Sequence, residues 1–203
     1  MRVTTFTPSE YFGANMYVID CDGFGAVIDP SCDYLKVKDF LENNGIEIKY
    51  IILTHAHFDH ILEIDSWKSN TPADVIVGVN EAAALRDSNL NCYKLFFNMD
   101  KIYDGPYVTV KDGDLLKLGQ KNIRIIETPG HSAGSISLSI DKNLFVGDTV
   151  FAGNSVGRTD LPGGDMQKLY NPINIINSLP PETLIYPGHG PKTSVTEIKT
   201  NII

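Results

Sequence analysis

The histidines of this chain are concentrated in one short stretch. Residues 54–60 read THAHFDH and place His55, His57 and His60 beside Asp59, although the whole chain of 203 residues contains only five histidines. In an extended segment His55 and His57 point to the same side, because side chains alternate. If the chain then turns into a helix, Asp59 and His60 project in a second direction, so one motif can serve two neighbouring metal positions. Imidazole and carboxylate together suit zinc, iron or manganese better than calcium or magnesium.

The two remaining histidines occur in a common sequence context. His131 lies in ETPGHSAG and His189 in IYPGHGPK, each after an apolar run and a Pro-Gly pair, and Asp148 follows the apolar run NLFVG. A single histidine near a strand end is more often structural, but the joint occurrence of all five favours a metal site built on loops of a rigid scaffold. The residue before each of these three side chains is a glycine, which allows a sharp turn and close approach to a ligand; these are Gly130, Gly147 and Gly188.

Hydrophobic patterning predicts the elements that must position these groups. The predicted strands are apolar or alternating runs, and they cover 16–20, 25–30, 48–53, 74–79, 123–127, 135–140, 143–147 and 183–188. The predicted helices cover 31–45, 61–68, 81–87 and 164–180, the last with Pro172 as a possible kink or late start. Residues 89–106 read as an irregular connection. No linker interrupts the pattern, so we expect one α/β unit.

Composition and charge restrict the class of protein. The chain is 42% hydrophobic, as expected for a globular protein with a core, and its formal net charge of −8 disfavours a nucleic-acid partner. There is no run of signal-peptide or membrane-spanning type. The three cysteines, Cys21, Cys32 and Cys92, lack any CxxC spacing. We therefore expect free thiols and a cytoplasmic location, with no membrane partner.

Taken in order, these motifs resemble the metallo-β-lactamase superfamily. The shared features are H-x-H-x-D-H, a distant His in TPGH, an Asp in GD and a last His in PGH, over residues 14–192. The resemblance implies an αββα four-layer sandwich and two divalent metal ions, zinc in the first place, with iron or manganese as alternatives. It implies one metal held by His55, His57 and His131, the other by Asp59, His60 and His189, and Asp148 bridging both.

Other positions narrow the resemblance within the superfamily. Class B1 and B2 β-lactamases carry Cys where Asp148 stands, class B3 lacks the bridging carboxylate, and flavodiiron proteins carry Glu where His57 stands. Antibiotic hydrolysis and diiron redox chemistry are thereby disfavoured. Residues 147–165, GDTVFAGNSVGRTDLPGGD, are similar to glyoxalase II and its shorter bacterial relatives. The chain ends 14 residues after His189, so we expect a single domain over 1–203 without the C-terminal helical domain that helps glyoxalase II hold glutathione.

The resemblance implies a hydrolase that uses a metal-bound hydroxide to cleave a small acyl thioester of the S-lactoylglutathione type. Whether glutathione is the thiol stays open, as does the oligomeric state. One alternative is a persulfide dioxygenase, in which a single iron would be held by His55, His131 and Asp148. Two further alternatives are a lactone hydrolase on the same scaffold and a metal-binding module without catalysis.

A few further residues have expected roles. We expect Asp59 both to bind metal and to orient the attacking water, with a ligand-only role as the alternative. Asp29 resembles the family's residue that supports a metal-bound histidine, although an Asp before Pro also suits a turn. Arg158 could meet a substrate carboxylate or pair with Asp160 to shape its loop. An aromatic cluster could line the substrate pocket or belong to the core, and it consists of Tyr93, Phe96 and Phe97.

Overall fold

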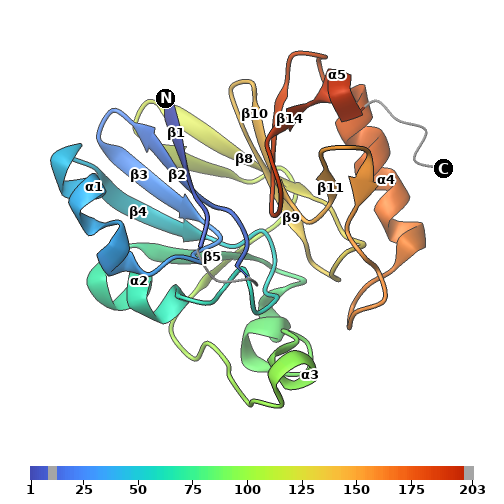
Figure 1. Cartoon of the computed structure of the whole chain (residues 1–203). Helices are drawn as coiled ribbons and strands as arrows, with labels where there is room; N and C mark the ends of the chain where they lie inside the picture. The colour runs from blue at the N-terminus through green and yellow to red at the C-terminus, as the bar shows by residue number, and fades with distance from the viewer. Residues whose placement is uncertain (9–12, 199–203) are drawn as a thin grey trace.

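The computed structural model describes residues 1–8 and 13–198, which form two six-stranded sheets packed face to face (Figure 1). In spatial order the first sheet contains β1 (Arg2–Phe6), β2 (Met16–Cys21), β3 (Phe24–Ile28), β4 (Glu47–Ile52), β5 (Asp74–Gly78) and β6 (Val108–Val110). The second contains β14 (Thr193–Ser194), β13 (Leu184–Pro187), β10 (Asn143–Gly147), β9 (Ile136–Ile140), β8 (Lys121–Glu127) and β7 (Leu115–Leu118). A small ribbon pairs β11 (Val150–Phe151) with β12 (Ser155–Val156).

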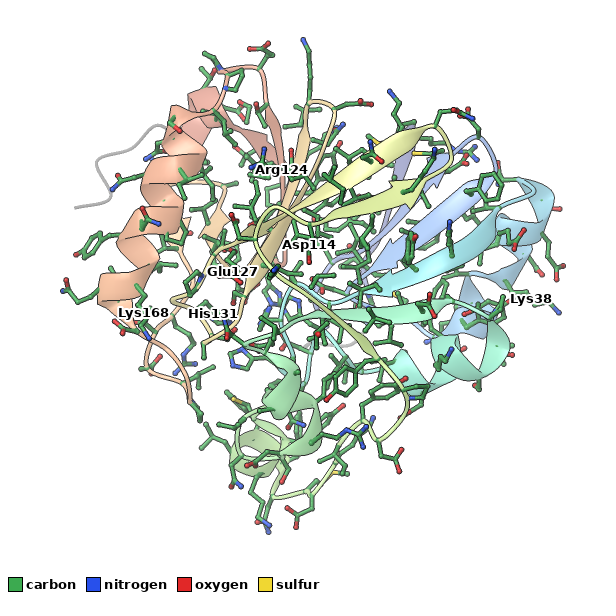
Figure 2. All side chains as sticks on the ribbon, turned by 180° about the vertical axis from the view of Figure 1, so that it is seen from behind. Lys38, Asp114, Arg124, Glu127, His131 and Lys168 are labelled. Atoms are coloured by element: carbon green, nitrogen blue, oxygen red, sulfur yellow. The ribbon has the colours of Figure 1, made fainter. Side chains whose placement is uncertain are left out.

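Helices cover the two outer faces of this pair of sheets. Those on the first sheet's side include α1 (Lys38–Asn43) and α2 (Ile64–Asn70), and those on the second sheet's side are α4 (Met166–Ser178) and α5 (Val195–Ile198). Lys38 of α1 and Lys168 of α4 accordingly lie at opposite sides of the molecule (Figure 2). The remaining helical segments are short: the 3₁₀ turns η1 (Tyr34–Lys36) and η2 (Ala82–Arg86), and α3 (Tyr93–Phe97).

The alternation of side chains along β2 shows how the layers arise. Tyr17 and Ile19 pack into the core between the sheets, whereas Met16 and Val18 pack outward under α1 and α2. A strand buried on both faces must be apolar at nearly every position, as β2 is. A third cluster packs the outer face of the second sheet against α4 and α5. The expected αββα four-layer sandwich is confirmed.

The eight predicted strands are all present, with ends shifted by at most two residues, and the other differences have physical reasons. The helix expected over 31–45 is instead η1 followed by α1, because Asp33 caps the first turn and Val37, at φ −114°, separates the two. The irregular connection predicted at 89–106 contains α3. The helix α4 continues through Pro172, where burial of its apolar face offsets the lost backbone hydrogen bond. The edge strands β1, β6, β7 and β14 were not predicted, since they are short or partly exposed.

The cysteines fit the expectation of free thiols. Cys21, Cys32 and Cys92 are all buried and unpaired with one another. Burial raises the pKa of each thiol, that of Cys92 to about 11. Within residues 1–8 and 13–198, no helix has the length and apolar character needed to cross a bilayer.

Candidate metal centre

The carboxyl ends of six strands meet at one edge of the two sheets. In the first sheet β3, β4 and β5 run parallel, and the loops after them carry Asp29, His55 and Glu81. In the second sheet β10 and β13 run parallel, and β8 runs the same way because β8 and β10 are both antiparallel to β9. The side chains in the loops after these three strands are His131, Asp148 and His189.

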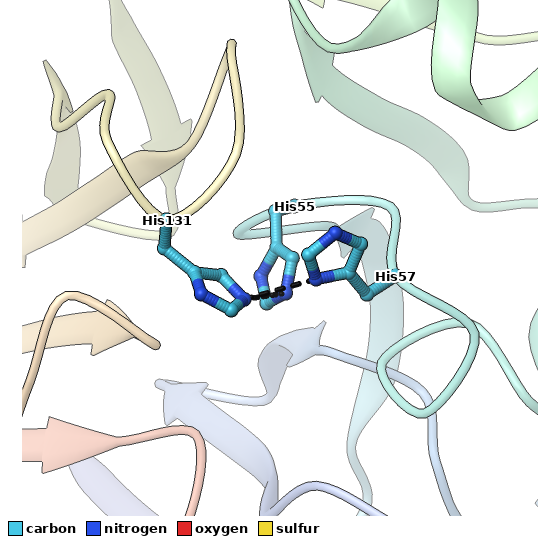
Figure 3. A group of neighbouring side chains, drawn as sticks. All are labelled: His55, His57 and His131. Carbon is cyan, nitrogen blue, oxygen red and sulfur yellow. Dashed lines mark hydrogen bonds between the residues drawn. The ribbon is translucent and has the colours of Figure 1, made fainter. Parts of the chain in front are cut away.

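Three buried imidazoles form the first group at this edge. His131 reaches it from the second sheet, where Arg124, Glu127 and His131 follow one another toward the edge (Figure 2). His55 and His57 come from the loop after β4 (Figure 3). Nε2 of His131 lies 2.9 Å from Nδ1 of His57 and 3.2 Å from Nε2 of His55. The three histidines are therefore arranged around a common point.

The partners on the far sides of two of these rings indicate which nitrogens carry protons. Nδ1 of His131 lies 2.8 Å from the carbonyl oxygen of Arg158, which can only accept, so this nitrogen donates. Nδ1 of His55 faces the hydroxyl of Thr54 at 3.3 Å, and that hydroxyl gives its own proton to Asp29. In the neutral rings both Nε2 atoms therefore present lone pairs toward each other. A cation between them removes the repulsion, so these imidazoles fit a metal ion.

A second group adjoins the first. Nε2 of His189 lies 3.0 Å from Oδ2 of Asp59 and 3.6 Å from Oδ2 of Asp148. Oδ2 of Asp148 also lies 3.6 Å from Nε2 of His131, so this carboxylate faces both groups. Nε2 of His60 and Oδ1 of Asp148 are 3.4 Å apart, and among the described residues neither atom makes a hydrogen bond. Buried polar atoms of this kind are expected at a metal site.

The directions of the pKa shifts differ between the two groups of histidines. Burial and the neighbouring histidines hold the pKa of His55 well below its ordinary value and lower that of His57 to about 3. Burial alone would raise the pKa of Asp59 and of Asp148, but the neighbouring histidines together outweigh it, and both are lowered. Burial would lower the pKa of His60 and of His189, but the adjacent carboxylates together outweigh it, and both are raised. A bound cation would replace the protons of these histidines as the partner of the carboxylates, and zinc binds both the carboxylate and the neutral imidazole.

Asp29 supports the second group from behind. Its Oδ2 lies 2.8 Å from Nδ1 of His60, which fixes that proton and directs Nε2 of His60 toward the site. The same carboxylate accepts hydrogen bonds from the backbone nitrogen and the hydroxyl of Thr54, both at 2.7 Å. Asp29 also has φ +51°, which is uncommon outside glycine. Both roles considered for Asp29, turn residue and support for a histidine, are thus compatible with its geometry.

Glu81 was not among the residues predicted from the sequence. It is 3% exposed, and its Oε1 accepts from the backbone nitrogen of Ala56 at 3.0 Å. Its Oε2 accepts from the hydroxyl of Ser132 and from the backbone nitrogen of Gly134, both at 2.8 Å. One carboxylate thus ties the loop after β4 to the loop after β8. The signal was present, because Glu81 follows the predicted strand at 74–79 as the other site residues follow theirs.

Two of the three glycines before the site residues allow close approach within the site, whereas the third, Gly130, allows close approach of α4, because a Cβ there would collide with Leu169. A Cβ on Gly188 would collide with Oδ1 of Asp148 and would also press on the ring of His60. Gly147 has φ +50°, where a side chain is strained, and a Cβ there would collide with the hydroxyl of Thr54.

A cavity of about 320 Å³ opens onto both groups. Its lining combines metal-site residues, an apolar wall and one positively charged side chain, that of Arg158. The lining residues are His57, Phe58, Asp59, Phe96, His131, Asp148, Phe151, Gly157, Arg158, Leu161 and His189. Arg158 pairs with Asp160 through two bonds of 2.7 Å. In the aromatic cluster, Tyr93 belongs to the core, whereas Phe96 lines the cavity and is 43% exposed.

Comparison with known proteins agrees with this architecture. A family model for the metallo-beta-lactamase superfamily matches residues 10–189. The chain belongs to this superfamily. It is 34% identical over 186 residues to "Probable metallo-hydrolase YqgX" of Bacillus subtilis (strain 168), an alignment that covers 90% of this chain and 87% of that protein.

Two solved structures of the metallo-beta-lactamase fold are similar over nearly the whole chain. BLEG-1, described as a B3 metallo-beta-lactamase, superposes with a TM-score of 0.88 at 32% identity and covers 97% of this chain and 95% of its own. TTHA1623, solved in a di-iron-bound form, superposes with a TM-score of 0.83 at 27% identity and covers 100% and 99%. Members of the superfamily bind divalent metals, and the clustered His and Asp side chains described above fit that property.

Proposed function

We propose that this metal-dependent hydrolase of the metallo-beta-lactamase superfamily cleaves a small acyl thioester. The observation that carries the proposal is that histidine nitrogens with free lone pairs and carboxylates converge beside one cavity. His55 and His131 direct their Nε2 atoms at each other, and Asp148 faces both groups. This is the arrangement expected of a centre for two cations rather than one.

The side chains divide into two sets of metal ligands. We assign His55, His57 and His131 to one ion, Asp59, His60 and His189 to the other, and Asp148 to both. When bound, such ions lower the pKa of a coordinated water to about 7 and polarise the acyl carbonyl. The nitrogen and oxygen donors favour zinc, and the di-iron form of TTHA1623 makes iron the first alternative.

Asp59 holds the position from which the attacking water can be oriented. It lines the cavity, and its Oδ2 lies 3.0 Å from Nε2 of His189, so the carboxylate is held in place. Hydrolysis forms a bond between the water oxygen and the acyl carbon and breaks the C–S bond. The sulfur leaves as a thiolate with the electron pair of the C–S bond. Of the two water protons, the thiolate takes up one through the solvent and the other is released, so the products at neutral pH are a carboxylate, a thiol and a proton. A thiol pKa near 8.5 means that little protonation of the leaving group is needed.

The test is thiol release by protein whose metal content has been measured. Protein with two metal ions is expected to hydrolyse S-lactoylglutathione or a neutral thioester such as S-acetyl-N-acetylcysteamine. His131→Ala, which removes one ligand of the first ion, is expected to lose at least about a hundredfold in kcat/KM. Equal rates for the parent and this variant, or no turnover of any thioester by the loaded protein, would contradict the proposal.

A second candidate is β-lactam hydrolysis, which the similarity to BLEG-1 favours. This candidate conflicts with the expectation that Asp148 disfavours antibiotic hydrolysis. A chromogenic cephalosporin and a lactone are therefore tested beside the thioesters. Faster turnover of the cephalosporin than of any thioester would replace the thioesterase assignment. One iron per chain, with oxygen consumption on glutathione persulfide, would instead indicate the dioxygenase.

A further inference from the structure

One wall of the cavity is apolar and directly adjoins the metal ligands. Phe58, Phe96, Phe151 and Leu161 contribute to it. The rings of Phe58 and Phe96 lie 5.1 Å apart, within the range of a favourable aromatic pair. Phe58 is buried, whereas Phe96 is 43% exposed, so an apolar surface remains open to the cavity. Large apolar side chains exposed beside polar groups are typical of ligand-binding pockets.

The position of Phe96 is fixed by the packing of α3. The backbone nitrogen of Phe58, in the loop that carries the site residues, donates to the carbonyl of Asn91 at 2.8 Å. The Asn91 side chain accepts from the backbone nitrogen of Tyr93 at 3.0 Å and donates to the carbonyl of Lys101 at 2.9 Å. Tyr93 is buried. The helix that carries Phe96 is therefore attached to the metal-binding loop.

Outside the two metal positions, the cavity offers few partners for a substrate with several charged groups. Among the described residues that line it, Arg158 is the one with a permanent positive charge. Its Nε and Nη2 are already bonded to Asp160. S-lactoylglutathione carries two carboxylates and one ammonium group, and outside the metal positions this lining offers the carboxylates one guanidinium, which is already bonded to Asp160. An apolar group, in contrast, would gain contact with the phenylalanine wall.

We propose that the thioester cleaved here carries a short apolar acyl chain, and that Phe96 determines this preference by packing against the chain. The assignment rests on the proposed thioesterase function and specifies its substrate class. Phe58 forms the floor of the acyl subsite and Phe96 its outer part, because Phe58 is buried and Phe96 is partly exposed. The thiol part of the substrate is neutral or carries one charged group, a carboxylate placed near Arg158.

The experiment compares acetyl, butyryl and hexanoyl thioesters of N-acetylcysteamine in metal-loaded protein. The kcat/KM is expected to rise about two- to fourfold for each added methylene that is buried. Phe96→Ala is expected to lower kcat/KM for the hexanoyl ester about tenfold and that for the acetyl ester less than about twofold. Phe96→Leu should keep most of the dependence on chain length, since it retains an apolar side chain.

Leu95 provides the matched control on the same helix. It is 61% exposed and does not line the cavity, so Leu95→Ala should leave the dependence on chain length unchanged. Direct binding of hexanoate and of acetate to metal-loaded protein, measured by isothermal titration calorimetry, gives a readout that does not depend on turnover, and Phe96→Ala should weaken only the binding of hexanoate.

The outcomes separate this assignment from the function on which it rests. Thioester turnover that is indifferent to acyl length, or is equal in Phe96→Ala and parent, would overturn the apolar subsite alone. Faster hydrolysis of S-hexanoylglutathione than of the neutral hexanoyl ester would overturn the preference for a weakly charged thiol. No turnover of any thioester by protein with two metals would overturn the thioesterase function, and the subsite with it.

Discussion

The carboxylate of Asp29 is linked by hydrogen bonds to histidines of both groups. It bonds Nδ1 of His60, the backbone of Thr54 and the Thr54 hydroxyl, and that hydroxyl in turn faces Nδ1 of His55. Through these contacts one residue influences the proton positions of two imidazoles from different groups. Asp29 directly follows β3 and has a left-handed backbone conformation, and from this position it makes all of these bonds.

Replacing Asp29 by asparagine tests this role. The amide of Asp29→Asn keeps the shape of the side chain but removes the charge that supports His60, so we expect metal affinity at the Asp59–His60–His189 position to fall about ten- to a hundredfold. Competition with a chromophoric chelator measures it. Asp33→Asn is the control, since Asp33 caps η1 in the same segment. Identical metal affinity in Asp29→Asn and parent would contradict the support role.

Gly188 offers a second test at the residue scale. In Gly188→Ala the new Cβ collides with Oδ1 of Asp148, so we expect the loss of at least one bound metal, measured by elemental analysis. Gly190→Ala is the matched control, because Gly190 has φ +76° but open space around its Cβ position. Its cost is backbone strain of about 1–2 kcal/mol, without loss of metal. If both variants keep full metal content, the close packing at Gly188 is not needed for binding.

At the scale of elements, the site depends on loops from two separate sheets. The loop after β4 and the loop after β8 are joined by Glu81, which lies between β5 and η2. A direct backbone bond of 2.8 Å, from Ile136 to Thr54, also joins the two sheets at this edge. Glu81 therefore sets how far His131 stands from His55 and His57.

Glu81→Gln should affect mainly the three-histidine position. The amide cannot accept hydrogen bonds at both ends, so one of the loop contacts is lost. We therefore expect the metal affinity of the three-histidine position to fall about tenfold. We also expect the free energy of unfolding to fall by about 1–3 kcal/mol. Stepwise metal titration beside Asp29→Asn separates the effects, because each variant should weaken a different step. A drop in stability with both affinities unchanged would show that Glu81 is merely structural.

The elements differ in how well the sequence predicts them. The strands that lead into the site were predictable because each is a compact apolar run followed by a polar motif. The helix α3 was not, because it has only five residues and is bounded by Cys92 and Asn98 in left-handed conformations, which leave no periodic signal. Phe96 therefore could not be assigned to the cavity rather than to the core. A buried acid such as Glu81 looks like any surface glutamate until its partners are known.

On the scale of the whole molecule, the candidate metal site joins the two halves of the sandwich. Its side chains come from loops of both sheets, and its buried lone pairs face one another. The sequence predicted this convergence from the repeated strand–turn context, and the resemblance supplied the four-layer fold, which no periodicity alone would have given. Helices over the outer faces follow from that fold, whereas the contacts between these helices and the strands beneath them are known only from the structure.

Metal removal should therefore destabilise the whole fold. Ligand binding to the folded state adds about 4 kcal/mol when the free metal exceeds the Kd about a thousandfold. For a chain of 203 residues this corresponds to a Tm shift of about 10 °C, measured by calorimetry before and after chelation. Re-addition of zinc should restore it. Equal Tm values with and without metal would argue against a site that links the sheets.

The most direct test of the account is the metal stoichiometry of the purified protein. Protein saturated with zinc, dialysed and analysed for metal and protein concentration should contain two ions per chain, and His131→Ala should contain fewer. A parent protein that retains no metal, or never more than one ion per chain after saturation, would contradict a dinuclear centre built from these seven side chains.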